Sequence, residues 1–410
     1  MAREMKDSGI DWIREIPILW QCVKLGFLYS FSSGDTLTAQ DFVDDGIYDV
    51  YGANGKRGKY DNYNVQGKHI LIGRVGALCG NIHLVNDDIW VTEHALVSNK
   101  LSEMVTDEYA AWLLNSMKLG QYASGTAQPV IAAENIRKLR IPLPSIEEQH
   151  LIATYLDDEC ARIDSVIDQT RASIEEYKKL KQAVITQAVT KGIRPDRQMK
   201  DSGVDWLGLV PVDWPVQRIA NLYDERNESG SAELPILTVS INTGISDHEI
   251  DDDEKQRVFV RSEDKSKYKR VYPGDLAYNM MRAWQGAFGA VRTDGMISPA
   301  YVVARPKGNS QLDSRYMEAL LRTPSAIEEM HRYSHGITDF RLRLYWPEFK
   351  NICVCVPPIY EQREIADYID EKSEQINSLV AKKEDLLSSL ESYKKSLIYE
   401  YVTGKKEVPA

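Results

Sequence analysis

The stretch LPSIEEQHLIATYLDDECARIDSVIDQTRASIEEYKKLKQAVITQAVTKG, Leu143–Gly192, predicts one long helix that determines the fold. Ser145 and Glu148 form an S-x-x-E capping box at its start, and Gly192 with Pro195 marks its end. Apolar residues recur in alternating steps of three and four, which is the heptad pattern of a coiled coil. At 1.5 Å per residue the helix is about 70 Å long. A helix of this length has too little core of its own and needs a partner.

A partner helix lies in the same chain, 213 residues further on. The segment PSIEEQ at 144–149 matches PPIYEQ at 357–362, and the exit Val189-Thr190 matches Val402-Thr403. The second copy lacks the S-x-x-E box, which leaves its start less well capped. Lysines at 181 and 394 interrupt both seams at the same place, as polar residues that specify register do. Two unrelated surface helices would not share these features. The predicted seam residues are Ile163, Ile167, Ile174, Tyr177, Val184, Ile376, Val380, Leu387, Leu390 and Leu397.

A short arm is duplicated as well. Met5–Trp20, MKDSGIDWIREIPILW, matches Met199–Trp214, MKDSGVDWLGLVPVDW, at an offset of 194 residues. The order arm, variable segment, long helix therefore occurs twice, which predicts pseudo-twofold symmetry with one variable domain at each end of the helix pair. We predict an α+β fold in which two α/β domains are joined by an antiparallel coiled coil. The predicted segments are 1–20 (arm), 21–143 (first variable domain), 144–192 (long helix 1), 193–214 (linker and second arm), 215–356 (second variable domain), 357–404 (long helix 2) and 405–410 (tail).

Composition and net charge limit the classes of protein to which the chain can belong. The chain has 410 residues, 43% of them hydrophobic, and we see no signal peptide and no apolar run of membrane length. Its five cysteines have no zinc-like spacing, so a reducing cytoplasm is expected. The net charge of −11 argues against nucleic-acid binding when averaged over the chain. The second variable domain is nearly neutral, however, so basic side chains can gather on one face.

Two stretches of the first variable domain suggest contact with nucleic acid. Gly52–Tyr63, GANGKRGKYDNY, reads as a glycine-rich loop whose cations suit phosphate and whose tyrosines suit stacking. A basic hairpin tip is the alternative. Ser124–Pro129, SGTAQP, precedes an expected helix start at Ala132 and could hold a phosphate or a base edge, or could simply cap the helix. The candidate DNA-binding residues here are Lys56, Arg57, Lys59, Tyr60, Arg74, Thr126 and Gln128.

The second variable domain contains three basic stretches. Lys255–Arg270 is strongly basic, Tyr278–Trp284 places Arg282 and Trp284 on one face if it is a strand, and Phe340–Trp346 alternates arginine with leucine as a strand would. One basic cluster is usually a solvated face, but three in one domain favour DNA, because the arginine fork suits guanine edges and phosphates. The candidates are Lys265, Lys267, Lys269, Arg270, Arg282, Trp284, Arg341, Arg343 and Tyr345.

Motifs for catalysis are missing from the sequence. There is no G-x-x-x-x-G-K-[ST] loop, no [DN]-P-P-[YF] sequence and no dinucleotide-binding fingerprint. The histidines and cysteines give no metal site that we would assign. We therefore expect no catalytic residue, no metal and no cofactor on this chain.

The duplicated M-K-D-S-G-[IV]-D-W arm, the duplicated P-x-x-x-E-Q helix with its V-T exit and the two variable inserts together resemble the specificity subunit of type I restriction–modification enzymes. Tyr51–Asp61, Trp90–Leu96 and Ser124–Pro129 also resemble one common kind of target recognition domain in that family. The resemblance implies a non-catalytic, DNA-binding chain. Each variable domain would be a target recognition domain that reads one half of a split, asymmetric DNA site.

The same resemblance implies the partners. The coiled coil would set the spacer between the half-sites and dock two methyltransferase (M) subunits, which bring S-adenosylmethionine and methylate adenine N6. Restriction (R) subunits would bring ATP-driven, Mg-dependent cleavage in defence against foreign DNA, and no membrane is involved. The alternatives are a coiled-coil scaffold whose two heads bind proteins or other ligands, and a specificity subunit that has lost its partners. Steep salt dependence of DNA binding separates the scaffold from the DNA reader.

Overall fold

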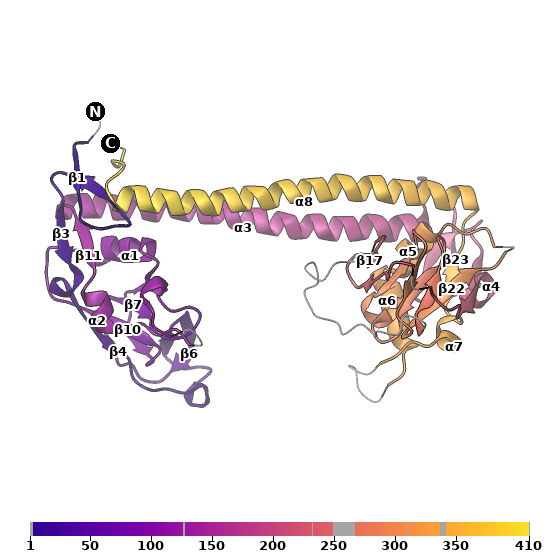
Figure 1. Cartoon of the computed structure of the whole chain (residues 1–410), viewed down its shortest axis with the longest axis horizontal. Helices are drawn as coiled ribbons and strands as arrows, with labels where there is room; N and C mark the ends of the chain where they lie inside the picture. Colours follow the sequence, from indigo (N-terminus) through magenta and orange to yellow (C-terminus); the bar gives the residue numbers. More distant parts are fainter. Residues whose placement is uncertain are drawn as a thin grey trace. The chain divides into compact units, whose positions relative to one another are not determined.

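The chain forms two compact units, each with one globular head. The computed structural model describes residues 3–125, 128–231, 233–248, 267–308, 310–336 and 342–409. Unit 1 comprises Met1–Ala172 with Glu384–Ala410, and unit 2 comprises Ser173–Lys383. We refer to the part of unit 1 before residue 144 as the first head, and to the part of unit 2 from 198 to 356 as the second head. Each unit also holds one end of the helix pair (Figure 1).

Two long helices run through the chain in opposite directions. They are α3 (Ile146–Lys191) and α8 (Ile359–Val402). In unit 1 the beginning of α3 packs against the end of α8, and in unit 2 the end of α3 packs against the beginning of α8. The predicted α+β fold with an antiparallel coiled coil is therefore confirmed. Of the predicted seam residues, Ile163, Ile167, Ile174, Ile376 and Leu397 are buried, and Tyr177, Val184, Val380, Leu387 and Leu390 are half-buried.

The lysines in the seam have polar partners in each unit. In unit 1, Lys394 Nζ lies 2.6 Å from the Asp164 carboxylate. At the matching place in unit 2, Lys181 Nζ donates to Asn377 Oδ1 at 3.0 Å. The 213-residue offset relates the two lysines, and it also relates Asp164 to Asn377. The duplicated contact is thus an ion pair in unit 1 and, in unit 2, a hydrogen bond from the lysine to an uncharged amide oxygen.

Both heads contain the same four-stranded antiparallel sheet, although their sequences are dissimilar. The strand order is β4-β10-β7-β8 in the first head and β15-β22-β19-β20 in the second. One helix packs against each sheet, α1 (Asp107–Ser116) in the first head and α5 (Ser314–Leu321) in the second. The sheet strands are β4 (Tyr29–Ser33), β7 (His69–Gly73), β8 (Ile82–Val85), β10 (Ala95–Lys100), β15 (Tyr223–Arg226), β19 (Leu276–Asn279), β20 (Phe288–Ala290) and β22 (Tyr301–Pro306).

Short strand pairs connect the heads to the helices in the same way in both units. The arms form the pairs β1 (Met5–Asp7) with β2 (Glu15–Pro17), and β12 (Met199–Asp201) with β13 (Leu209–Pro211). A second pair precedes each long helix: β3 (Gln21–Lys24) with β11 (Arg140–Leu143), and β14 (Val216–Arg218) with β23 (Cys353–Cys355). Trp20 and Trp214, at the ends of the arms, are fully buried in the two main cores.

The remaining elements differ between the heads. The first head adds a three-stranded sheet in the order β6-β5-β9, and the second adds the pairs β16-β17 and β18-β21. These strands are β5 (Tyr48–Gly52), β6 (Gly55–Tyr60), β9 (Ile89–Val91), β16 (Val239–Ser240), β17 (Gly244–Ile245), β18 (Lys269–Val271) and β21 (Gly295–Ile297). The short helices are η1 (Leu25–Phe27), η2 (Ala39–Asp41), η3 (Leu119–Tyr122), α2 (Ala133–Arg137), α4 (Ile219–Leu222), η6 (Ala283–Gln285), α6 (Pro324–Arg332) and α7 (Trp346–Phe349).

Three local predictions need correction. Gly52–Tyr63 is mostly a β-hairpin, β5–β6, because Gly52 pairs with Gly55 and only two residues lie between them. Only Tyr278 and Asn279 of the stretch Tyr278–Trp284 lie in a strand, β19, because the Asn279 side chain accepts a hydrogen bond from Met281 N (3.0 Å) and the chain turns there. In the described part of Phe340–Trp346, Leu342 and Leu344 are buried and Arg343 is exposed, but a single β-bridge replaces the expected strand.

No helix within the described ranges combines the length and the apolar character needed to cross a membrane.

Candidate nucleic-acid interface

A carboxylate at the start of each long helix fastens the arm to it. In unit 1, Glu148 accepts a hydrogen bond from Trp20 Nε1 (2.9 Å) and pairs with Arg3. Glu148 is therefore engaged with the arm. Only half of the predicted capping box is seen, in which Ser145 Oγ accepts from Glu148 N at 3.3 Å. The sequence identifies the right residue here but assigns it the wrong partner.

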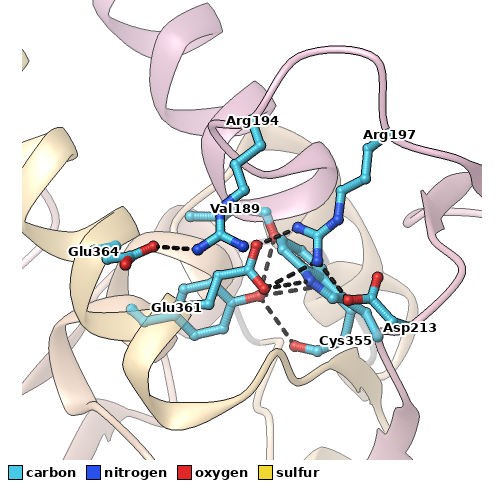
Figure 2. Close-up of polar contacts among 9 residues, drawn as sticks. Val189, Arg194, Arg197, Asp213, Cys355, Glu361 and Glu364 are labelled. Atoms are coloured by element: carbon cyan, nitrogen blue, oxygen red, sulfur yellow. Dashed lines mark hydrogen bonds and ion pairs between the residues drawn. The ribbon is translucent and has the colours of Figure 1, made fainter.

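The same carboxylate recurs in unit 2. Glu361 accepts from Trp214 Nε1 (3.1 Å) and pairs with Arg197, which also pairs with Asp213. Figure 2 shows the Arg197 guanidinium between Glu361 and Asp213, with Arg194 reaching the neighbouring Glu364. The Glu361 side chain is fully buried, so its charge depends on these partners.

The glutamine after each carboxylate fastens the head. Gln149 Oε1 accepts from Thr106 N (2.8 Å), and its Nε2 donates to Met104 O (2.8 Å) and Pro144 O (3.0 Å). In unit 2, Gln362 makes the equivalent three contacts with the segment before α5 and with the residue before its own helix. The duplicated Glu-Gln therefore orients each head on its helix. The sequence reveals this motif through its repetition but does not indicate what it does.

A buried tyrosine joins each head to the end of the other repeat's helix. The Tyr109 hydroxyl lies 3.0 Å from Val402 O, and the Tyr316 hydroxyl lies 3.0 Å from Val189 O. Figure 2 shows Val189 and Cys355, whose carbonyl oxygens both lie within hydrogen-bonding distance of the Tyr316 hydroxyl. Burial raises the pKa of both tyrosines well above the usual value, so they remain neutral hydrogen-bonding groups.

Polar residues gather at one edge of the first head. Arg74 follows β7 and donates through Nη1 to Ser33 Oγ (3.0 Å), at the end of β4, and to Glu93 O (3.4 Å), before β10. The same edge receives the segment that contains Gln128, because Ile131 N donates to Arg74 O at 2.9 Å. Gln128 itself is exposed.

The β5–β6 hairpin carries the remaining candidates of the first head. Lys56 is paired with Asp49 at 2.8 Å, whereas Arg57 and Lys59 are exposed and have no ion pair within the described ranges. The Tyr60 ring packs edge-on against Trp90, with 5.1 Å between ring centroids. Arg57 and Lys59 are thus the hairpin cations that form no ion pair within the described ranges, although Asp49, the partner of Lys56, also lies opposite Lys59 in the strand pair.

In the second head, two candidates are directed into the protein's own structure. Lys269 Nζ donates to Tyr301 O at 2.7 Å, and burial lowers the pKa of its ammonium. The Arg270 guanidinium lies over the Tyr272 ring, 4.7 Å from the centroid. Lys267, next to them, is exposed.

Other candidates meet at one edge of the second head. Arg282 and Arg343 are exposed and have no ion pair with any residue that the structure describes. The bond from Leu344 N to Met280 O (2.8 Å) brings the segment with Arg343 beside the turn with Arg282. Trp284 packs edge-on against His331, and Tyr345 is 42% exposed. Lys265, Thr126 and Arg341 lie outside the described residues.

The two edges occupy matching positions in the two heads. The bond from Ile131 N to Arg74 O follows β7, and the bond from Leu344 N to Met280 O follows β19, its counterpart. A β-bridge closes the adjoining loop in both heads, between 124 and 130 in the first and between 335 and 343 in the second. Val130–Ile131, just after SGTAQP, and Arg343–Leu344, within FRLRLYW, therefore have equivalent places in the fold although they are unrelated in sequence. Sequence comparison alone could not reveal this, because only backbone bonds relate them.

Two heads with the same sheet topology, each joined to the long helices by the same kinds of contact, define a duplicated, two-headed class of fold. The family model "Type I restriction modification DNA specificity domain" matches residues 17–176. By this match, the first head and the adjoining part of α3 are similar to the DNA specificity domain of type I restriction–modification enzymes.

Named relatives show the extent of the match. The EcoprrI specificity subunit of Escherichia coli is 35% identical over 151 residues, which is 36% of this chain and 37% of that protein. The EcoBI specificity subunit of Escherichia coli is 22% identical, over 95% of this chain and 88% of its own length. The MjaVIII specificity subunit of Methanocaldococcus jannaschii is 23% identical, over 96% and 94%.

Solved structures show the same fold. A chain from a study of complex assembly and conformational transition of the type I R-M system has a TM-score of 0.67 at 15% identity, covering 95% of this chain and 99% of that one. The HsdS subunit from Thermoanaerobacter tengcongensis has a TM-score of 0.51 at 17% identity, covering 95% and 98%.

Proposed function

We propose that each head reads one half of a bipartite DNA site, with residues 21–143 and 215–356 as the two target recognition domains. The observation that supports this most strongly is that each head carries exposed arginine without an ion pair among the described residues: Arg57 on the β5–β6 hairpin of the first head, and Arg282 and Arg343 at the edge of the second. Phosphate contacts position a protein on the duplex, and base contacts supply the specificity. Two heads that each read a few base pairs multiply their selectivity, since each mismatch costs roughly 1–3 kcal/mol.

We propose that the coiled coil sets the spacer between the half-sites. Both long helices are continuous, over 46 and 44 residues, and each head is fastened at a helix start through the Glu-Gln contacts. A head held by a buried carboxylate, a glutamine and a tyrosine keeps a defined orientation on its helix. The number of helical residues between these attachment points then determines which half-site spacing both heads can bind at once.

The partners proposed for this chain are double-stranded DNA, two methyltransferase subunits docked on the helical region, and restriction subunits, all in the cytoplasm. S-adenosylmethionine, ATP and Mg would be bound by those partner subunits. This chain would supply the sequence specificity, and its partners would methylate or cleave the DNA.

The experiment that tests DNA reading is a salt titration of duplex binding. The complex of this chain with its methyltransferase subunits is mixed with labelled duplexes at increasing salt, and binding is followed by fluorescence anisotropy. Binding led by phosphate contacts should weaken steeply as salt rises. A scaffold whose heads bind proteins or other ligands would show no DNA binding, and that result would overturn the proposal.

A further inference from the structure

A turn at the edge of the first head holds polar atoms that have no hydrogen-bond partner. Thr92 Oγ1, Glu93 Oε2 and the neighbouring Trp90 Nε1 are shielded from water, and none has a partner among the residues that the structure describes. Leaving a buried polar atom unpaired costs about 1–3 kcal/mol, and more for a charged group. Three such atoms in neighbouring residues are therefore an unusual concentration of unmet hydrogen-bonding capacity.

The turn is held in place by its backbone. Glu93 O accepts from Ser33 Oγ at 3.3 Å and from Arg74 Nη1 at 3.4 Å, and Arg74 N donates to His94 O at 2.8 Å. Thr92 N donates to Tyr51 O at 2.8 Å, which ties the turn to the hairpin. The Glu93 side chain is 35% exposed, with Oε1 3.4 Å from His94 Nδ1, and it extends from a fixed backbone, as specific recognition requires. Thr92 is fully buried behind it.

Gly52 keeps this site compact. A Cβ at position 52 would lie 2.7 Å from Arg57 Cδ and 3.4 Å from Thr92 Oγ1. Without that atom, the Arg57 side chain packs against Gly52, and Thr92 lies close to the same glycine. The hairpin that adjoins the turn therefore carries a cation with no ion pair within the described ranges.

The chemistry of the turn suits base edges better than phosphate. A phosphate accepts hydrogen bonds and is repelled by a carboxylate, so a surface that only held phosphates would have no use for Glu93. Glutamate accepts hydrogen bonds from the exocyclic amino group of cytosine in the major groove, and adenine N6 offers an amino group of the same kind. The Trp90 indole can only donate, and the Thr92 hydroxyl can do both.

The second head has a different residue at the position that matches Glu93. The first residue of β10, Ala95, pairs with the last residue of β7, and the first residue of β22, Tyr301, pairs with the last residue of β19. Counting two residues back from each gives Glu93 in the first head and Pro299 in the second. The heads therefore share their framework but differ in the side chain at this place, as readers of two different half-sites must.

We propose that Glu93, held by the buried turn behind it, reads the exocyclic amino group of a cytosine or adenine in the half-site of the first head, while Arg57 neutralises an adjacent phosphate. The inference rests on the proposed DNA-reading function and deepens it by naming a specificity-determining residue.

The test uses the complex of this chain with its methyltransferase subunits, expressed in a host without adenine methylation and read by single-molecule sequencing. Glu93→Gln should lower discrimination about tenfold at one base pair of one half-site and leave the other half-site unchanged. Thr92→Val removes the unpartnered hydroxyl. Because that hydroxyl is fully buried and has no partner among the described residues, this variant should leave both the recognised bases and the thermal stability of the chain unchanged.

Two control variants separate recognition from folding. Ser98→Ala removes a buried hydroxyl that accepts from Ile70 N at 2.8 Å, so it should lower stability and leave the recognised bases unchanged. Lys59→Gln removes an exposed hairpin cation and should weaken binding to all sites alike. A wild-type bipartite motif that Glu93→Gln leaves unaltered, or a uniform loss of methylation with unaltered base preference, would overturn the role of Glu93 only. Absence of any bipartite motif in the wild type would overturn the proposed function itself.

Discussion

The indole nitrogen of Trp20 donates a hydrogen bond to Glu148 Oε2 across 2.9 Å, and Trp214 makes the same contact with Glu361 across 3.1 Å. In both units an arginine from before the arm, Arg3 or Arg197, pairs with the same carboxylate and lies over the same indole. The heads between these contacts have diverged in sequence, while the contacts that fasten them to the helices are duplicated. The chain thus combines a repeated frame with two separately adaptable recognition surfaces.

The buried carboxylate gives the first prediction. Glu361→Ala should lower the free energy of unfolding by about 3 kcal/mol, because Arg197 and Trp214 lose a fully desolvated partner. Denaturant titration of the full chain measures this loss. Glu364→Ala is the matched control, because Glu364 pairs with Arg194 one helical turn away on an exposed surface. Its effect should be far smaller, and equal losses would contradict the structural role assigned to Glu361.

The end of α8 gives the second prediction. Gly404 has φ +72°, and a Cβ there would lie 2.5 Å from the Pro17 ring. Gly404→Ala should therefore lower the melting temperature of unit 1 through both backbone strain and collision with the arm. Gly9→Ala carries similar strain at φ +64° but has nothing within 4 Å of the added atom. We expect the larger drop for Gly404→Ala in a thermal melt, and the reverse order would count against this packing.

The hairpin cations give the third prediction. Arg57→Gln and Lys59→Gln should each reduce the slope of log affinity against log salt by about one unit, because each removes one phosphate contact. Lys56→Gln serves as the control. Lys56 already pairs with Asp49, so its removal should change the slope less. Anisotropy titrations of the complex at several salt concentrations compare the three variants with the unaltered chain. If all three variants keep the slope of the unaltered chain, this hairpin is excluded from the interface.

The coiled coil gives the fourth prediction. Inserting seven residues into both α3 and α8 keeps the heptad seam in phase and should change the preferred spacer between the half-sites without changing the bases read. The methylated motif of the variant shows the outcome. The same insertion in one helix only should mispair the seam and lower stability. An unchanged spacer in the double insertion would refute the idea that helix length sets the spacing.

Much of the frame could be predicted from the sequence because it is duplicated. The long helices, their antiparallel pairing and the arms follow from repeats at offsets of 213 and 194 residues, and heptad periodicity identifies the face of each helix that packs. The partner of Glu148 could not be predicted, because a glutamate at this position suits a capping box and suits a contact with the distant Trp20 equally well. The sequence marks such a position without saying which contact is made.

The candidate interface was harder to predict, because charge alone does not distinguish an exposed cation from an internal one. Lys269 belongs to a basic stretch, yet its ammonium bonds to a carbonyl group inside the head. Arg57 and Lys56 are adjacent in the sequence, but only Lys56 has an acidic partner among the described residues, and that partner comes from the neighbouring strand. The Thr92–Glu93 turn carries no excess of positive charge, so a search for basic clusters passes over it.

The most direct test of the central claim is a map of adenine methylation. The chain is co-expressed with its methyltransferase subunits in a host without adenine methylation, and N6-methyladenine is read by single-molecule sequencing. Two heads on one helix pair predict a single bipartite motif with a fixed gap between two different half-sites. A contiguous motif, or methylation without sequence preference, would contradict it.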